Sequence, residues 1–491
     1  MSRTLTRRSF LSCTTAALGA FAVTEAWDRL QAAAQPEAKA DSVIFIWLPG
    51  GVSQMETWDP KPFTPYRQGM RGNELFATCD SMPTSADGIR LGAGLPHLAK
   101  VMHHATVIRS IANEAKFGAL HLKAQYYMMT GYVPPSGVRA PSMGAVISRL
   151  KGRRQAQVPG YVYIGRDIDT NDVEKQFINE FIGGGFYGVN YSPFMIPDPS
   201  RGLATLNTLP GLPAQRIDER LGLWRTVAKN GPAELQDSPK AAEFQKQMDE
   251  ARALMDSPVK KAFNYAKEEK PETLAAYEPE ITRDRLLDKN YYHGKRFAHG
   301  LLLARRLVET GARFVQVEYQ YGPFLGFDIH ANGAKRMVEM KQQIDRPIAQ
   351  LIKDLDQRGL LKRTLVVVAS EFGRTIASAP SAGVEPEGFA EKHTGADLVI
   401  ENEEMYGLHG HFSSTNAMLL FGGGFKGGYV YGKTAAEHPM VPIENAVRLE
   451  DVHATIYQAL GIAPDTHFVT EGRPFYVTRD GKGKPVTAML A

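Results

Sequence analysis

Cysteine is nearly absent from this chain, which has two among 491 residues. Cys13 lies in an N-terminal segment that we interpret as a removable signal, so the mature protein keeps only Cys79. A single thiol cannot form an intramolecular disulfide, even in an oxidising compartment. The residues around Cys79 offer no group that would activate the thiol, which argues against a cysteine nucleophile.

Long runs of one charge are missing as well. Lysine and arginine number 57, aspartate and glutamate 53, and the formal net charge is +4. Because no basic run stands out, we expect no nucleic-acid partner. Charged residues make up 22% and hydrophobic residues 43%, the composition of an ordinary globular protein that is long enough to bury a sizeable core.

The N-terminus has the layout of an export signal. The paired residues Arg7 and Arg8 precede an uncharged stretch, 11–24, and three alanines at 32–34 offer a cleavage site. This pattern is typical of a twin-arginine signal over residues 1–34. It predicts passage through the twin-arginine export machinery to the periplasm or cell envelope of a bacterium. The alternative is an amphipathic helix at the start of a cytosolic protein; the apolar stretch is too short for a comfortable membrane anchor.

The remainder alternates between short apolar runs and helical patterns. Buried strands are predicted at 42–48, 105–110, 159–165, 313–319, 364–369 and 417–421, and helices at 121–130 and 451–460. Strands separated by helices indicate an α/β fold with a largely parallel sheet covered on both faces.

The stretch between the two strand-rich parts is charged and helix-forming, with helices predicted at 242–255 and 284–308. We therefore predict a first part of the α/β core at 42–215, a helical insertion at 216–308, a second part of the core with the metal-site loops at 309–465, and a C-terminal tail at 466–491.

Polar residues that follow the predicted strands are the candidates for a functional site. Asp328 and His330 follow strand 313–319, and Glu371 follows strand 364–369; His409 and His411 lie further on. The carboxyl ends of strands are where α/β sheets place their ligands. Two carboxylates and three imidazoles suit a divalent metal such as zinc, manganese or iron.

Several segments together resemble a known family. They are 50–62 (GGVSQMETWDPKP), 327–330 (FDIH), 370–375 (SEFGRT), 421–428 (FGGGFKGG) and 451–455 (DVHAT). They are similar to the domain-of-unknown-function 1501 family, exported bacterial proteins placed in the alkaline phosphatase and sulfatase superfamily. The resemblance implies a mainly parallel central sheet between helices, with metals and a nucleophile at its carboxyl edge.

The resemblance also implies site residues. Asp328, His330 and His411 match the ligands of one metal. The Asp-His pair of a second metal is replaced by Glu371-Phe372, which favours one divalent metal (zinc, manganese, iron or calcium) over two. The position of the nucleophile, nine residues before Thr130 in the phrase Met-Met-Thr-Gly, falls on His121.

The histidines leave several roles open. His121 could be a nucleophile, a general base, a fourth ligand or a buried hydrogen-bonded residue; base or ligand is preferred, because Lys123 and Gln125 offer no partner that would fix its tautomer. His409 and His411 point the same way if their segment is extended. One would then ligate the metal while the other donates a proton or supports it, unless both are surface residues.

Arg374 and the loop at Gly50 and Gly51 each allow two interpretations. Arg374 either pairs locally with Glu371 or holds an anionic group, with Glu371 as a ligand or base. The loop at Gly50 and Gly51 either embraces an anion with its N–H groups or reverses the chain tightly. Gly51 and Ser53 are its anion-binding candidates, and Ser53 is the nearest alternative nucleophile.

These observations predict a metal-dependent hydrolase of a small phosphate or sulfate ester. The alternative is a non-catalytic binding or envelope-assembly protein that keeps the fold with a degraded metal site and has an envelope protein as its partner.

Overall fold

The computed structural model describes residues 35–112, 120–133, 139–165, 181–206, 211–236, 238–257, 259–281, 293–322, 325–377, 398–470 and 473–491. The predicted export signal, residues 1–34, lies outside the described residues, as do residues 284–292 of the predicted helix 284–308. No helix among the described residues combines the length and the apolar character needed to cross a bilayer.

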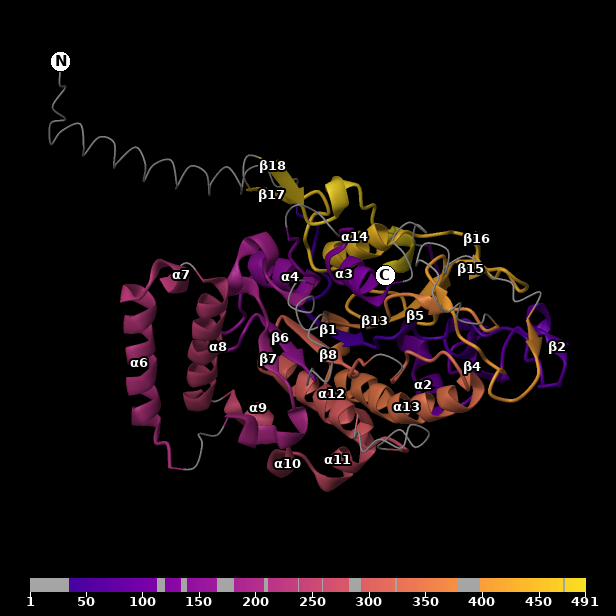
Figure 1. Cartoon of the computed structure of the whole chain (residues 1–491), viewed down its shortest axis with the longest axis horizontal. Coiled ribbons are helices and arrows are strands. Elements are labelled where there is room, and N and C mark those ends of the chain that lie inside the picture. Colours follow the sequence, from indigo (N-terminus) through magenta and orange to yellow (C-terminus); the bar gives the residue numbers. More distant parts are fainter. Residues whose placement is uncertain are drawn as a thin grey trace, which may run out of the picture.

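A sheet of eight strands forms the centre of the molecule (Figure 1). In spatial order its strands are β14 (Tyr429–Tyr431), β5 (Ala105–Ile111), β13 (Asn416–Gly422), β9 (Thr364–Ala369), β1 (Ser42–Trp47), β8 (Phe314–Glu318), β6 (Tyr161–Ile164) and β7 (Phe194–Ile196). Within this sheet only β13 runs antiparallel to its neighbours β5 and β9. All other pairings are parallel, so the predicted α/β fold with a mainly parallel sheet is confirmed.

Helices cover both faces of the sheet (Figure 1). One layer has α3 (His121–Thr130), α4 (Met143–Lys151) and α14 (Leu449–Ala459), and the other has α2 (Pro96–Ala99), α12 (His293–Glu309) and α13 (Gly333–Gln357). Strand β1 shows why both layers are needed. Ile44 and Ile46 pack into one apolar cluster, while Val43, Phe45 and Trp47 pack into the other. A strand buried on both faces needs this continuous apolar run rather than alternation.

The helices of the predicted insertion, 216–308, differ in their packing. Helices α6 (Ala214–Asn230), α7 (Ala233–Gln236) and α8 (Pro239–Asp256) form a projection at the left of Figure 1. Next along the chain come α9 (Lys260–Phe263), α10 (Tyr265–Glu268) and α11 (Pro271–Tyr277), of which α9 packs on α12 and α11 on α13. Helix α12 instead packs on β8 and β1 as part of a covering layer. The division into parts stays a prediction.

Small two-stranded sheets complete the described strands. They pair β10 (Gly373–Arg374) with β12 (His411–Phe412), β2 (Met70–Arg71) with β11 (Val399–Ile400), β3 (Ser81–Pro83) with β4 (Arg90–Gly92), β15 (Lys433–Thr434) with β16 (Pro442–Glu444), and β17 (His467–Thr470) with β18 (Arg473–Tyr476). The first pair bears on function, because its register places Arg374 opposite His411.

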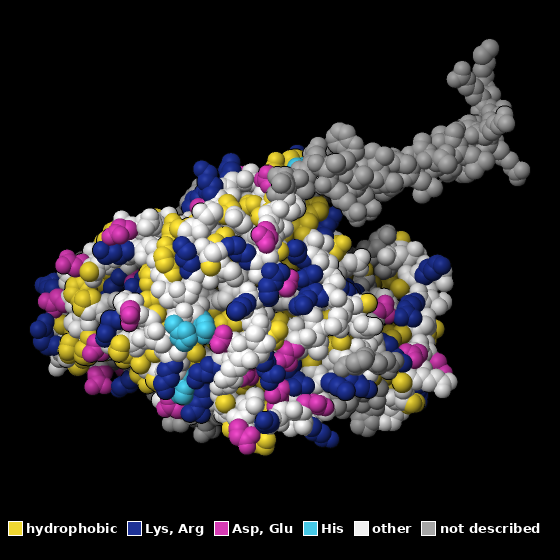
Figure 2. Space-filling view, turned by 180° about the vertical axis from the view of Figure 1, so that it is seen from behind, with side chains coloured by type: hydrophobic (Ala, Val, Ile, Leu, Met, Phe, Trp, Pro, Cys, Tyr) yellow, Lys and Arg dark blue, Asp and Glu magenta, His cyan; other side chains and the backbone are white. Residues whose placement is uncertain are grey.

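The carboxyl ends of β1, β8 and β9 meet at one edge of the sheet. These strands are parallel neighbours, so the described residues that follow them, 48–53, 319–322, 325–330 and 370–372, come together there. On the opposite view of the molecule, acidic and basic side chains are interleaved over the surface (Figure 2). That face carries no broad basic field of the kind that binds nucleic acid.

Candidate metal centre

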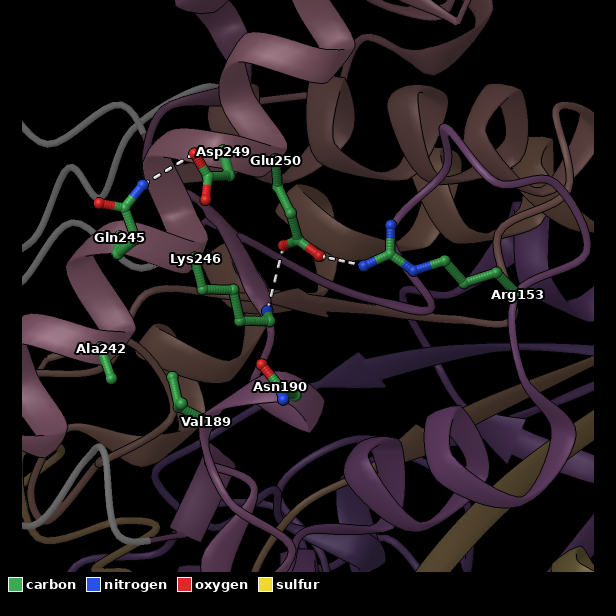
Figure 3. Close-up of a pocket in the computed structure, with 8 residues that line it drawn as sticks. All are labelled: Arg153, Val189, Asn190, Ala242, Gln245, Lys246, Asp249 and Glu250. Atoms are coloured by element: carbon green, nitrogen blue, oxygen red, sulfur yellow. Dashed lines mark hydrogen bonds and ion pairs between the residues drawn. The ribbon is translucent and has the colours of Figure 1, made fainter. Parts of the chain in front are cut away.

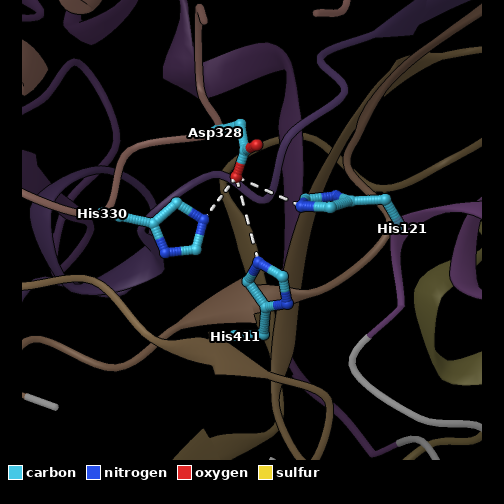
Figure 4. A group of neighbouring side chains, drawn as sticks. All are labelled: His121, Asp328, His330 and His411. Carbon is cyan, nitrogen blue, oxygen red and sulfur yellow. Dashed lines mark hydrogen bonds and ion pairs between the residues drawn. The ribbon is translucent and has the colours of Figure 1, made fainter. Parts of the chain in front are cut away.

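Four side chains converge at the carboxyl edge of the sheet (Figure 4). His121 is the first residue of α3, Asp328 and His330 lie in the loop between β8 and α13, and His411 begins β12. Each offers one ligand atom, and these atoms all lie within 4.8 Å of one another. We call these four residues the His–Asp cluster. Three separate parts of the chain thus deliver the imidazole and carboxylate donors that transition metals prefer.

The distances within the His–Asp cluster fit one ion. The Nε2 atoms of His330, His121 and His411 lie 2.9, 3.1 and 3.9 Å from Asp328 Oδ1. Ligands about 2.1 Å from a tetrahedral ion stand about 3.4 Å apart, and the three distances bracket that value. Among the residues that the structure describes, this is the one group of histidine, cysteine and carboxylate side chains with such an arrangement. How many metals the protein binds stays a prediction.

Solvent reaches the cluster from the imidazole side. The side chain of Asp328 is 3% exposed, whereas those of His121, His330 and His411 are 13, 16 and 13% exposed. The ring of Phe372 packs against His121 and His411, with ring centroids 5.0 and 4.7 Å apart. The carboxylate is thus enclosed and the imidazoles form its rim.

Burial and hydrogen bonds fix the charges of the cluster. Burial alone would raise the pKa of Asp328, but its hydrogen bonds with the three histidines hold that pKa well below its usual range. Burial lowers the pKa of His330, and burial together with the charge of Arg374 lowers the pKa of His411 to about 3. Both rings are therefore neutral at physiological pH, as metal ligation requires.

His121 differs from the other two histidines. Burial disfavours its protonated form, but hydrogen bonds to Asp328 and Glu371 outweigh burial and raise the pKa of His121 to about 9. In the absence of a metal, the imidazolium supplies the positive charge that faces both carboxylates. Ligation would require His121 to release that proton.

Arg374 is fully buried and its guanidinium N–H groups are occupied by the protein. Their acceptors are the carbonyl oxygens of Gly50, Gly51, Ile329 and His409 and, at 2.6 Å, Asp328 Oδ1. No N–H remains to hold a substrate anion, so the expected role of Arg374 as an anion clamp is not supported. Arg374 instead joins the loops after β1 and β8 to the segment before β12 and fixes the carboxylate of Asp328.

Glu371 lies behind the cluster rather than in it. Its side chain is fully buried, and its Oε1 lies 2.8 Å from Nδ1 of His121. The local ion pair expected between Glu371 and Arg374 does not form through hydrogen bonds, because the guanidinium bonds elsewhere. The expected role of Glu371 as a ligand or base is therefore not supported by its position.

His409 does not join the cluster, contrary to the expectation that it ligates a metal. Its Nε2 lies 2.9 Å from Oε2 of Glu56, and both side chains are 1% exposed. Residue 409 precedes β12, so the alternation of an extended strand does not govern its direction. Glu56 belongs to η1 (Gln54–Glu56), a short 3-10 helix in the segment after β1. We call these two residues the Glu56–His409 pair.

The glycine loop after β1 is filled by the protein's own groups. The N–H of Gly50 donates to Glu371 Oε1 at 2.9 Å, and the N–H of Gly51 donates to Ser370 Oγ at 3.1 Å. The expected anion-binding role of Gly51 is therefore wrong for its N–H group. Both glycines have positive φ, and a Cβ at Gly50 would overlap the backbone of Asp328. The Ser53 hydroxyl is buried without a hydrogen-bond partner.

Sequence reasoning missed two carboxylate–histidine contacts, Glu371 with His121 and Glu56 with His409. The residues of each pair are far apart in the chain, and no local pattern predicts that they meet. One signal was present, because His121 and Gln125 stand four residues apart on α3 and share a helix face. Gln125 Nε2 indeed donates to Glu371 Oε1 at 3.3 Å.

A hollow lies elsewhere, beside α8 (Figure 3). It has a volume of about 450 Å³ and is lined by residues of α8, by Val189 and Asn190, and by Arg153. Glu250 accepts hydrogen bonds from Arg153 and Lys246 there. Because these charged groups satisfy one another, the groove offers no converging set of free polar groups, and it contains none of the predicted site residues.

The chain belongs to the family described as Protein of unknown function (DUF1501), whose match covers residues 40–490. This confirms the resemblance read from the motifs. No curated protein matches the chain.

Solved structures with a similar arrangement include three enzymes. The lipoteichoic acid synthase LtaP from Listeria monocytogenes shares 10% identity over 91% of this chain and 76% of that chain, with a TM-score of 0.35. The sulfatase PsFucS1 from Pseudoalteromonas sp. shares 10% over 87% and 68%, with a TM-score of 0.34. The phosphonate monoester hydrolase SpPMH from Silicibacter pomeroyi shares 12% over 92% and 76%, with a TM-score of 0.30. All three scores lie below 0.5, so these likenesses carry no argument about function.

Proposed function

We propose that this chain is an exported, metal-dependent hydrolase of an anionic ester, a phosphate or a sulfate, in the bacterial cell envelope. The observation that carries the proposal is the His–Asp cluster. Three imidazoles and one carboxylate, from three separate parts of the chain, meet at the carboxyl edge of the sheet with ion-sized spacing. Such an edge is where α/β folds place their reactive groups.

The formal charge of the site favours an anionic substrate. The carboxylates of Asp328 and Glu371 and the guanidinium of Arg374 leave a charge of −1 when the imidazoles are neutral. A divalent ion changes that charge to +1. In a largely buried site, this excess positive charge attracts a phosphate or sulfate group without a dedicated arginine clamp.

The chain's own residues hold and orient the reacting centre. The four residues of the cluster would bind the ion, Arg374 holds Asp328 in place, and Phe372 covers one side of the imidazoles of His121 and His411. When bound, a divalent ion supplies Lewis acidity and an acidified water. His121 stands where the family resemblance expects a hydroxyl nucleophile, so attack by water is favoured over a covalent intermediate.

The ligand set narrows the metals expected from the sequence. Calcium prefers oxygen ligands, and the cluster has one carboxylate against three imidazoles. Imidazole suits zinc, manganese and iron. We therefore favour these three over calcium. Export in the folded state by the twin-arginine machinery, which the signal at 1–34 predicts, would carry a seated ion to the envelope.

Elemental analysis of protein purified without chelator tests this function. We expect close to one zinc, manganese or iron per chain, lost in an Asp328→Ala/His411→Ala double variant, and metal-dependent hydrolysis of an aryl phosphate or aryl sulfate. The matched control is His409→Ala, which removes a nearby imidazole outside the cluster. Absence of bound metal, and no uptake on titration, would contradict the proposal.

A second candidate function has a specific observation in its favour. Four protein ligands complete a tetrahedral ion, and closed sites of this kind are structural in many proteins. The cluster would then stabilise a non-catalytic binding or envelope-assembly protein whose partner is another envelope protein. Stoichiometric metal without hydrolysis of either ester class would favour this alternative.

A further inference from the structure

We propose that Glu371 is a positioning residue that fixes the imidazole of His121 for metal binding, an inference that rests on the metal centre proposed above. Its carboxylate accepts from Nδ1–H of His121, which leaves the lone pair of Nε2 directed into the His–Asp cluster. Glu371 thus acts on the site through His121, and does so as neither ligand nor base.

The geometry sets the two nitrogens of His121 apart. Nδ1 lies 2.8 Å from Glu371 Oε1, and Nε2 lies 3.1 Å from Asp328 Oδ1 inside the cluster. A neutral imidazole has one N–H and one lone pair. Because a carboxylate can accept a hydrogen bond but has no proton to donate, Glu371 holds the N–H of His121 at Nδ1. The remaining nitrogen, which can bind a metal, is the one that faces His330 and His411.

The carboxylate of Glu371 is itself held rigidly. The N–H of Gly50 and the amide of Gln125 donate to Oε1 at 2.9 and 3.3 Å, and the Ser370 hydroxyl donates to Oε2 at 3.1 Å. With His121 these contacts give Oε1 three donors, so that oxygen has no capacity left to bind an ion or take a proton from water. The same contacts stabilise the carboxylate and prevent it from rotating away.

Carboxylates that accept from the outer nitrogen of a ligating histidine raise its basicity and set its orientation. Loss of such a carboxylate is therefore expected to weaken metal binding without abolishing it. Loss of such a partner weakens metal binding by about 10–100-fold. Loss of Glu371 therefore leaves the four ligands in place with a less basic and less well oriented His121.

The chain contains a matched control in the Glu56–His409 pair. That pair is also buried and joins a carboxylate to an imidazole at 2.9 Å, but its histidine is outside the His–Asp cluster. Glu371→Gln and Glu56→Gln each remove one buried negative charge that faces a histidine. Only the first is expected to act on the metal.

The test is the zinc dissociation constant of wild type, Glu371→Gln and Glu56→Gln, measured by competition with a chromophoric chelator. We expect Glu371→Gln to bind zinc 10–100-fold more weakly and Glu56→Gln to stay within threefold of wild type. Nitrogen-15 NMR of the zinc-loaded wild type should show His121 with its proton on Nδ1. Equal affinity of Glu371→Gln and wild type would overturn the inference, as would a proton on Nε2.

Two further outcomes separate this inference from the proposed function. Zinc binding by wild type with the expected loss in Glu371→Gln, but no ester hydrolysis, supports the positioning role and contradicts the hydrolase. Wild type that takes up no zinc contradicts both. If Glu371→Gln does not fold, Glu371→Asp keeps the charge, withdraws it by one methylene from His121, and is expected to lose affinity in the same direction.

Discussion

His409 and His411 stand two residues apart in the chain and serve different regions of the molecule. His411 lies in the His–Asp cluster, whose imidazoles keep part of their surface exposed. His409 lies in the Glu56–His409 pair, where both side chains are 1% exposed. Both regions join carboxylates to imidazoles, so composition alone does not distinguish a metal site from a structural pair.

The difference lies in how many imidazoles share one carboxylate oxygen and whether solvent reaches them. Asp328 Oδ1 faces three imidazole rings, and solvent reaches the group from the exposed side of those rings. This arrangement suits a bound ion. Glu56 faces one ring, and its other oxygen accepts from the Thr78 hydroxyl, which completes a closed contact. The first arrangement gathers three rings around one carboxylate oxygen, whereas the second joins one buried carboxylate to one buried ring.

The largest expected effect comes from Asp328→Asn. The change keeps the shape but removes the negative charge, which leaves Arg374 buried and unpaired. Loss of one partner of a buried ion pair lowers the free energy of unfolding by about 3–5 kcal/mol. We expect this loss in urea unfolding together with loss of bound metal by elemental analysis. Glu56→Gln is the comparison, because it should lower stability while metal content stays at the wild-type level.

Removal of the metal should destabilise the protein through the His–Asp cluster alone. An ion present at 1,000 times its dissociation constant stabilises the folded state by about 4 kcal/mol. Thermal unfolding of metal-loaded protein should therefore shift downwards on addition of a chelator. The shift should persist in His409→Ala and vanish in His411→Ala. A chelator shift of equal size in both variants would contradict the assignment of the two histidines.

The two histidines should also differ in metal affinity. His411→Ala removes a ligand, and the loss should exceed the roughly 100-fold that an outer partner can contribute. His409→Ala should change the zinc dissociation constant by less than threefold. The measurement is a chelator competition on the folded variants, checked by circular dichroism.

A smaller effect should separate steric from conformational strain at the loop after β1. Gly50 has φ +114°, and a Cβ there would overlap the backbone of Asp328; Gly69 has φ +78° and nothing within 4 Å of a Cβ. Gly69→Ala should lose about 1–3 kcal/mol from backbone strain alone. Gly50→Ala should lose a further 1–3 kcal/mol from overpacking, and should weaken metal binding. An equal loss of unfolding free energy in Gly50→Ala and Gly69→Ala would show that a Cβ at residue 50 does not overlap the backbone of Asp328.

The smallest effect concerns pH and the Glu56–His409 pair. Burial alone would raise the pKa of Glu56, but attraction to His409 holds it below its ordinary value of 4.5. A depressed folded-state pKa stabilises the protein above the unfolded pKa, and this contribution is lost as the pH falls through the folded value. The decline in the free energy of unfolding below about pH 4.5 should therefore be shallower in Glu56→Gln. The control is Glu437→Gln, which removes an exposed carboxylate outside the pair.

Much of the fold was readable from local patterns. The apolar run Thr364–Ala369 became β9 without change, and the predicted helix His121–Thr130 became α3. The short spacing of Asp328 and His330, just after a strand, also drew attention to two residues that the structure brings together with His121 and His411. Each of these signals lies within a few residues, where periodicity and strand ends constrain the chain directly.

The roles of Arg374 and Glu371 could not be predicted in the same way. Arg374 stands three residues from Glu371, which suggested a local pair, yet it bonds to Asp328 and to carbonyl groups of three other loops. Buried charges take the partners that satisfy most of their donors, and for Arg374 those partners came from loops that are distant in the chain.

The sequence by itself determined the elements, their order and the chemical kinds of residue at the sheet edge, because hydrophobic periodicity and strand ends are local properties. Only the tertiary structure decided that His121 and His411 meet at Asp328, that Glu371 stands behind His121, and that His409 turns to Glu56. These contacts join residues more than 80 positions apart in the chain, and the direction of His409 also depends on where the extended segment of β12 begins. The long-range contacts and the start of β12 are both set by the packing of the whole sheet.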